Sequence, residues 1–349
     1  MLLKELTELN GISGNEHKVR EFIKNEVESY ADDIKVDNMG NLIVYKKGKG
    51  GRYKLMLSAH MDEVGMMVTG YNESGCLKFK TVGGIDERIL PGKRVLAGDS
   101  RIPGVIGCKP LHLQEREERN SGIKLKNMYI DIGVGKKEDA EKLLPLGEYI
   151  AFHSEFTKFG EKRIKAKALD DRAGCAVIIE ALKGEYDFDI FACFTVQEEI
   201  GLRGSEIAAY SVNPDLAFVI EGTTCSDVPG VEKQDYSTTM DGGAVLTLMD
   251  RTSYSDRSLV DYIYGIAEKN RIKVQFKQTT TGGNDAGKIQ LTRGGVKVAS
   301  ISVPCRYIHS PASVMSEKDY KACIKLVKAA LEDLNNEDKI SNLIKGGGK

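Results

Sequence analysis

Histidine and acidic side chains directly follow three short apolar runs of the sequence. The runs cover residues 55–57, 190–196 and 216–220, and their length predicts strands that are buried on both faces of a sheet. The residues that follow them are His60 and Asp62, then Glu198 and Glu199, then Glu221. In an open α/β sheet the carboxyl ends of the strands meet at one edge, where ligands bind. We therefore expect these side chains to converge on a single site.

Two further groups of the same chemistry lie at the ends of other predicted elements. Asp170 and Asp171 open a predicted helix, and His309 lies in the loop after an apolar strand at residues 296–303. Together with the strand-end residues they form a set of imidazole and carboxylate ligands, which suits Zn²⁺, Co²⁺ or Mn²⁺. Such a set does not indicate copper or iron–sulfur chemistry.

A structural ion-pair cluster is the alternative to a metal site. Two like charges about 4 Å apart repel by roughly 4 kcal/mol at an effective dielectric constant of about 20, so gathered carboxylates need a cation. Arg172 and Arg203 lie nearby in the sequence and could supply it. Guanidinium groups would leave both imidazoles without a role, whereas two divalent ions explain the histidines and the carboxylates together. Taken alone, each residue also has an ordinary structural explanation, such as a helix cap for Asp170.

The composition is that of a globular protein long enough for two domains. The chain has 349 residues, of which 41% are hydrophobic and 29% charged. The formal net charge is −1, so no long-range positive field exists to collect nucleic acid or anionic lipid. The N-terminal segment lacks the apolar core of a signal peptide, and no apolar run reaches membrane-spanning length. We expect a cytoplasmic protein with neither nucleic acid nor a membrane as partner.

The cysteines point to neither a disulfide framework nor a thiolate zinc site. There are 7 of them, an odd number, and none forms a close CxxC pair. We expect them to be reduced, with Cys175 and Cys193 in the core.

Amphipathic helices are predicted near both ends of the chain. Ser13 and Glu16 have the spacing of a capping box before a first helix. Ser316 and Asp319 repeat this spacing before a long closing helix.

The segments between these helices divide into a core and an insertion. The apolar strands alternate with a helix after Leu169, which predicts an α/β fold with a mixed, mostly parallel sheet flanked by helices. Residues 66–164 instead carry turn signals about every ten residues, which predicts a small inserted β-barrel-like domain. The catalytic domain would then be discontinuous, at 1–65 and 165–349. The charged run at 114–119 is expected to be a solvated loop and the final GGGK a mobile tail.

Five ordered segments of the sequence resemble one family over nearly the whole chain. They are SAHMDEVG, KALDDRAGC, VQEEIGLRGS, IEGTT and CRYIHSP. They resemble the motif series of the glutamyl and deblocking aminopeptidases, co-catalytic metallopeptidases that include the tetrahedral aminopeptidases and some members labelled endoglucanase or cellulase. GISGNE and TGGNDAG resemble further segments of that family. The resemblance implies a zinc peptidase core of the phosphorylase/hydrolase-like fold.

The resemblance also implies a ligand set for two divalent metal ions per chain. Asp170 would bridge the ions, His60 and Glu221 would complete one, and Glu199 and His309 the other. Each ion would keep an open position for water or substrate, as catalytic sites do. The family often has Asp where this chain has Glu221, which leaves the affinity and identity of the His60 metal open.

The same resemblance assigns catalytic roles to two other acids. Glu198 would be the general base, taking a proton from the bridging water and returning it to the leaving amine. Because neighbours in a strand point to opposite faces, Glu198 and Glu199 can both face the site only if the chain leaves strand geometry there. Asp62 would orient the ring of His60.

The function implied is a two-metal aminopeptidase, in which a metal-bound hydroxide attacks the scissile carbonyl of a peptide. The inserted domain would mediate dimer contacts and help to cover the site, and the homo-oligomer implied by the family extends from a dimer to a dodecamer. Three alternatives stay open: a metal-dependent carboxypeptidase or amide deacylase, a glycosidase that uses Glu198 with a second carboxylate, and a binding protein with a vestigial site. The preferred N-terminal residue and the metal are left open.

Overall fold

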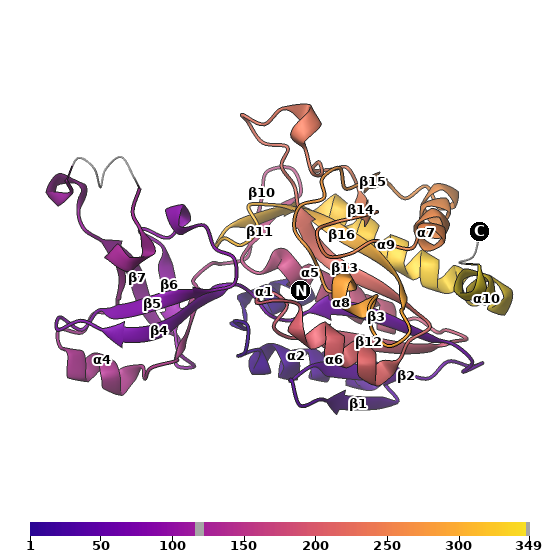
Figure 1. Cartoon of the computed structure of the whole chain (residues 1–349), viewed down its shortest axis with the longest axis horizontal. Helices are drawn as coiled ribbons and strands as arrows, with labels where there is room; N and C mark the ends of the chain where they lie inside the picture. Colours follow the sequence, from indigo (N-terminus) through magenta and orange to yellow (C-terminus); the bar gives the residue numbers. More distant parts are fainter. Residues whose placement is uncertain (116–121, 347–349) are drawn as a thin grey trace.

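The computed structural model describes residues 1–115 and 122–346, which fold into an α/β body and a β-barrel that projects from one side of it (Figure 1). The charged run at 114–119 and the C-terminal GGGK lie largely outside these described residues. Across the described ranges, no helix is both long and apolar enough to cross a bilayer.

Among the described residues, an 11-stranded mixed sheet forms the centre of the α/β body. Its central strands β12, β3, β13 and β16 run parallel, and antiparallel strands extend it on both sides. The strands are β1 (Asp33–Val36), β2 (Leu42–Lys46), β3 (Lys54–His60), β10 (Thr157–Phe159), β11 (Arg163–Ala166), β12 (Asp189–Thr195), β13 (Leu216–Thr224), β14 (Ala244–Thr247), β15 (Val274–Phe276), β16 (Lys297–Arg306) and β17 (Ser313–Ser316). Every apolar run predicted as a strand lies in this sheet, which confirms the predicted fold class.

Helices cover both faces of the sheet (Figure 1). The helices α5 and α9 pack directly on one face, with α1, α2 and α7 against them, while α6 and α8 cover the other face. The helices are α1 (Leu2–Glu8), α2 (His17–Val27), α5 (Leu169–Leu182), α6 (Arg203–Val212), α7 (Arg257–Lys269), α8 (Ala286–Ile289), α9 (Glu317–Asp333) and α10 (Glu337–Lys345). Beyond its charged first turn, α5 is apolar except at Glu180, because neighbouring elements bury it on nearly every side.

The segment after β3 forms a closed barrel with its own apolar core. Its strands are β4 (Gly65–Tyr71), β5 (Leu77–Val82), β6 (Arg94–Ala97), β7 (Ile102–Cys108), β8 (Met128–Asp131) and β9 (Tyr149–Phe152), and α4 (Lys137–Leu143) packs beside them. The chain rejoins the large sheet earlier than residue 165, because β10 and β11 pair with each other and β11 pairs with β17. The proposed division into domains stays a prediction.

The two predicted helix caps have different outcomes. The closing helix α9 begins as predicted, since the hydroxyl of Ser316 accepts the backbone N–H of Lys318. The predicted capping box of the first helix is wrong. Helix α2 begins at His17 after Glu16, and the hydroxyl of Ser13 donates to the buried carboxylate of Asp62 at 2.6 Å instead. A hydrogen bond to a buried carboxylate is stronger than one to an exposed helix end, so the Ser13 hydroxyl bonds to Asp62 and not to the helix.

Arg172 is fully buried and binds backbone carbonyls rather than carboxylates of the site. Its guanidinium donates to the carbonyl oxygens of Leu6, Leu9, Gly11 and Met61 at 2.5–3.5 Å. The N-terminal segment is therefore tied to α5 by one side chain. The cysteines are unpaired, and Cys175 and Cys193 are buried as predicted.

We predict that Arg172→Lys lowers the free energy of unfolding by about 2 to 4 kcal/mol, because an ammonium cannot reach the carbonyls that the planar guanidinium spans and leaves some of them buried without a donor. Urea unfolding of the purified protein measures the change. Arg203→Lys is the matched control, since Arg203 is exposed at the start of α6. Equal stability of the two variants would contradict the prediction.

Candidate metal centre

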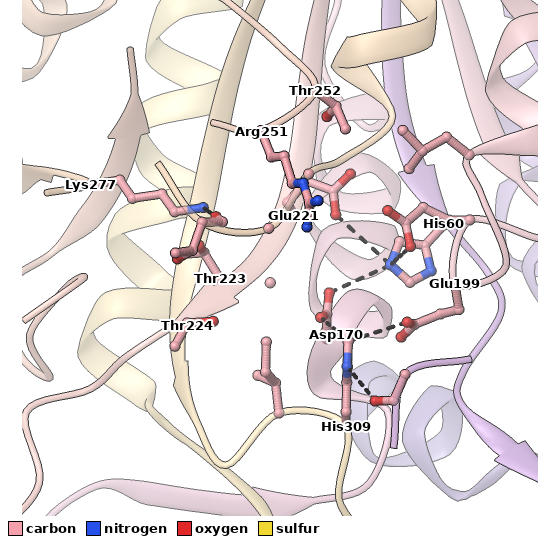
Figure 2. A pocket seen from close by; sticks show the side chains of 18 residues that line it. His60, Asp170, Glu199, Glu221, Thr223, Thr224, Arg251, Thr252, Lys277 and His309 are labelled. Carbon is pink, nitrogen blue, oxygen red and sulfur yellow. Dashed lines mark hydrogen bonds and ion pairs between the residues drawn. The ribbon is translucent and has the colours of Figure 1, made fainter. Parts of the chain in front are cut away.

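The ligand residues predicted from the sequence gather at the carboxyl edge of the parallel strands (Figure 2). They are His60, Asp170, Glu199, Glu221 and His309. His60 ends β3, whereas Glu221 lies within β13, which runs on past the point where the apolar run predicted its end. The parallel register thus collects residues that are far apart in the sequence.

Asp170 stands between the two imidazoles. Its Oδ1 lies 3.5 Å from Nε2 of His60 and its Oδ2 lies 3.6 Å from Nε2 of His309. The backbone at Asp170 is not helical although the residue lies at the start of α5. Gly222 on β13 leaves room for this arrangement, because a Cβ there would come within 2.9 Å of the Asp170 Cα.

Each imidazole faces a second carboxylate. Nε2 of His60 lies 3.8 Å from Oε2 of Glu221, and Nε2 of His309 lies 3.2 Å from Oε2 of Glu199. The cluster therefore has two halves, one on each side of Asp170.

Both histidines turn the same ring nitrogen toward the cluster. Nδ1 of His60 faces the backbone oxygen of Asp62 at 3.1 Å, and Nδ1 of His309 faces that of Gly84 at 2.9 Å. A carbonyl can only accept, so Nδ1 carries a proton in each ring, and Nε2 is the nitrogen whose lone pair can bind a metal when the ring is neutral. This is the tautomer that a metal ligand needs.

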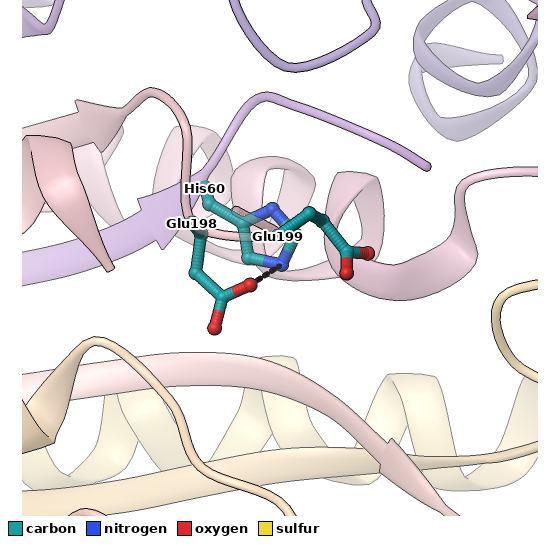
Figure 3. A group of neighbouring side chains, drawn as sticks. All are labelled: His60, Glu198 and Glu199. Atoms are coloured by element: carbon teal, nitrogen blue, oxygen red, sulfur yellow. Dashed lines mark ion pairs between the residues drawn. The ribbon is translucent and has the colours of Figure 1, made fainter. Parts of the chain in front are cut away.

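Glu198 and Glu199 both face the site because the chain leaves strand geometry after β12. Gln197 has a φ of +57°, and Figure 3 shows Glu198 reaching the ring of His60 with Glu199 beside it. Oε2 of Glu198 lies 3.8 Å from Nε2 of His60. The chain therefore departs from strand geometry at this point, as the sequence analysis required if Glu198 and Glu199 were both to face the site.

Asp62 supports the turn as well as the ring. Its carboxylate accepts the backbone N–H of Glu198 at 3.0 Å and of Glu199 at 3.1 Å, and lies 3.4 Å from Nδ1 of His60. The predicted contact with the ring is therefore shared between the Asp62 carboxylate and its backbone oxygen.

Burial and mutual repulsion shift the pKa values of the acids. Burial, followed by the charges of Glu199 and Asp285, raises the pKa of Glu198 well above its usual value, although His60 opposes the shift. Burial, aided by Asp170, raises the pKa of Glu199 to about 7. Burial beside Asp171 likewise raises the pKa of Glu221. A cation placed among these carboxylates would favour their charged forms.

Asp170 and the histidines shift in the opposite sense. Burial alone would raise the pKa of Asp170, but the hydrogen bonds from both imidazoles outweigh it and lower that pKa. Burial alone would lower the pKa of His309, yet Asp170 and Glu199 raise it to about 9. The same balance, set mainly by Glu198 and Asp170 against burial, raises the pKa of His60.

The donor set fits divalent metal ions. Oε1 of Glu221 is buried and has no hydrogen-bond partner within the described part of the chain, as expected of an oxygen reserved for a ligand. Over the same residues, the ion pairs of the cluster carboxylates join them only to imidazoles. The alternative in which Arg172 supplies the cation is wrong, because its guanidinium lies among backbone carbonyls.

A cavity of about 680 Å³ opens in front of the cluster. Its other walls carry Arg251 and Lys277 together with the hydroxyls of Thr223 and Thr224 (Figure 2). Lys277 is partly buried, which lowers its pKa, and its ammonium donates to the backbone oxygen of Thr281 at 2.8 Å. The cavity therefore joins an acidic end to a basic wall.

Two acids named in the sequence analysis make contacts at the site that the sequence reasoning did not assign to them. Asp171 is wholly buried below the cluster and accepts the backbone N–H groups of His60 and Gly174. Glu16 accepts the backbone N–H of Gln197. Glu16 lies in the GISGNE segment, which the sequence reasoning had singled out. Its role could not be inferred from that segment, because it depends on a contact with Gln197, which is distant in sequence.

Comparison with known proteins agrees with this geometry. The sequence profile of the M42 glutamyl aminopeptidase family matches residues 40–326. A putative aminopeptidase of Acetivibrio thermocellus is 39% identical over 332 residues, which cover 95% of this chain and 97% of that protein.

Solved structures give the same result. Aminopeptidase APDkam598 from the archaeon Desulfurococcus kamchatkensis superposes with a TM-score of 0.93 and 35% identity, covering 99% of this chain and 97% of that chain. The TET1 peptidase of Pyrococcus horikoshii, which can assemble into a tetrahedron or a large octahedral shell, superposes with a TM-score of 0.84 and 35% identity, covering 94% of this chain and 98% of that chain. Profile, sequence and fold therefore agree along most of the chain, which belongs to the M42 glutamyl aminopeptidase family.

Proposed function

We propose that this chain is a two-metal aminopeptidase that removes N-terminal residues from peptides. The position of Asp170 carries the proposal, because one carboxylate that faces two imidazoles with its two oxygens is suited to bridge two ions. Membership of the M42 family supports the aminopeptidase activity.

The ligands divide between the two sides of Asp170. His60 and Glu221 would hold one ion, and Glu199 and His309 the other. Imidazole and carboxylate ligands suit zinc, cobalt or manganese. When bound, such a pair of ions polarises the scissile carbonyl and lowers the pKa of water near neutral pH.

Glu198 is suited to move the proton. Its Oε2 lies 3.8 Å from Nε2 of His60, the same distance as Oε2 of Glu221, and burial raises its pKa above the usual value of a carboxylate. The role of base rather than ligand follows from the family resemblance. Its carboxylate would take a proton from the attacking water and return it to the leaving amine. Asp62 would keep both His60 and the turn that carries Glu198 in place.

The alternatives explain less of the site. A glycosidase needs a pair of carboxylates and leaves His60 and His309 without a role. A carboxypeptidase or amide deacylase could use similar ligands, but the family favours the aminopeptidase reaction.

The basic wall of the cavity favours an acidic residue at the N-terminus of the substrate. Within the described residues no carboxylate pairs with Arg251 or Lys277, so both cations are available to a ligand. A Glu or Asp side chain of the substrate would bind them while its scissile bond lies at the cluster.

The barrel is suited to cover the site and to form subunit contacts. Its loop after β5 supplies Gly84, which lines the cavity and binds His309. Its surface exposes Val105, Leu143 and Leu146. These apolar side chains, together with the assembly of the TET1 peptidase, support a homo-oligomer.

Glu198→Gln should lower kcat by at least about 100-fold, because the amide cannot accept a proton, while bound metal stays nearly unchanged. Asp170→Asn should instead lose metal, because it removes the charge between the two halves. Turnover of an aminoacyl chromogenic substrate and metal analysis of the dialysed protein measure both effects. Equal metal loss in the two variants would mean that the roles of base and ligand are exchanged.

The metal-free protein should lose stability as the pH rises from about 5 to 9. The pKa of Glu199 is raised from 4.5 to about 7 and that of His309 from 6.5 to about 9, so these two groups hold more protons in the folded state than in the unfolded chain in this window. Its stability therefore falls with rising pH, and bound ions should flatten the slope because they replace those protons.

Thermal unfolding of the chelated protein across this range, with and without added zinc, measures the effect. The contribution of Asp170 to stability does not change between about pH 5 and 9, since its lowered pKa lies below this range. A chelated protein that is most stable at the alkaline end would contradict the prediction.

Lys277→Met should lower kcat/KM for an N-terminal Glu substrate by about tenfold, the usual scale for a lost charge-assisted contact, and change that for a Leu substrate little. Arg271→Met is the matched control, since Arg271 is exposed just before β15 and does not line the cavity. If the wild type prefers Leu or Lys over Glu, the aminopeptidase proposal stands and the acidic preference falls.

A further inference from the structure

The turn that carries Glu198 and Glu199 has left the sheet, and its backbone N–H groups bond to carboxylates from other segments. Those of Glu198 and Glu199 donate to Asp62, as described above. The N–H of Gln197, the residue with positive φ, donates to Oε1 of Glu16 at 3.1 Å. Three successive backbone N–H groups thus donate to two acids, and Glu16 accepts the one from Gln197, where the chain turns away from the strand.

Glu16 is buried at this contact. The residue is 4% exposed, and the same oxygen accepts the backbone N–H of Gly14 at 2.7 Å. Glu16 precedes the first residue of α2, but its side chain makes no capping hydrogen bond to that helix. The burial of this carboxylate is therefore not explained by a structural role at the helix end.

The segment around Glu16 is anchored to the body of the protein by hydrogen bonds and by buried side chains. Gly11 is held by Arg172, and Ser13 donates to Asp62. Val19 and Ile23 of α2 are fully buried in the main core. An acceptor fixed in this way can define the position of the turn on the other side of the contact.

We propose that Glu16 is a positioning residue, which holds the carboxylate of Glu198 in its working position by fixing the backbone of Gln197. The proposal rests on the proposed function, since it needs Glu198 to be the base. Without the acceptor at residue 16, the N–H of Gln197 is left without its partner and the turn is free to shift. A displacement of about 1 Å at a reacting group can cost about 100-fold in rate, so kcat should respond and KM should not.

The test compares two substitutions of nearly the same size. Glu16→Gln keeps an oxygen acceptor, and Glu16→Met keeps the volume but removes it. We expect Glu16→Met to lower kcat by about tenfold or more with KM within about threefold, and Glu16→Gln to retain kcat within about threefold. Glu26→Met, on the exposed face of the same helix, is the control and should behave as wild type. Equal kcat in the Gln and Met variants would overturn the proposal.

A second measurement separates positioning of the base from a general loss of structure. In a Glu198→Gln background the base is already absent, so Glu16→Met should have little further effect on kcat. The same fold-loss in both backgrounds would overturn the proposal. If Glu16→Met does not fold, Glu16→Asp replaces it, because the shorter side chain withdraws the acceptor and should give the same loss of kcat.

If Glu198→Gln itself retains full activity, the assignment of the base has failed and the role of Glu16 fails with it. If Glu198→Gln is inactive and Glu16→Met is fully active, only the role of Glu16 has failed.

Discussion

Repulsion among buried carboxylates is the constraint on which this site depends. Glu198, Glu199 and Glu221 converge with Asp170 in a space where burial already disfavours charge. The two imidazoles offset this only in part, because each presents a single Nε2 to several oxygens. Cations bound among these acids would relieve the repulsion, so the metal binding that we propose would be linked to the stability of the protein.

The surrounding structure holds this cluster through main-chain atoms. Backbone oxygens of Asp62 and Gly84 aim the imidazoles, and the N–H groups after β12 bind buried carboxylates. Arg172 in turn binds the carbonyls of the N-terminal segment that supplies Glu16. The polar groups that secondary structure leaves unpaired at strand ends are thereby satisfied by neighbouring segments.

Most of the fold and the membership of the cluster could be predicted from the sequence. Short apolar runs identify central strands because both faces of these strands are covered, and ligands at their carboxyl ends must meet. The errors have a common cause. Ser13 bonds to Asp62 rather than capping α2, and Arg172 binds backbone carbonyls and Glu63 rather than the acids of the cluster, because these partners are distant in sequence and local patterns do not encode them. The basic wall at Lys277 was missed for the same reason.

The contact between His309 and Gly84 lets the inserted barrel orient a side chain of the site through its backbone. The imidazole is aimed by a main-chain oxygen, and a main-chain oxygen is present whatever side chains surround it. The exterior of the barrel is therefore free to diverge, and with it the surfaces available for assembly, while the histidine keeps its orientation. A change in the length of the loop after β5 would have the reverse effect, since it would move the acceptor and leave the barrel surface as it was.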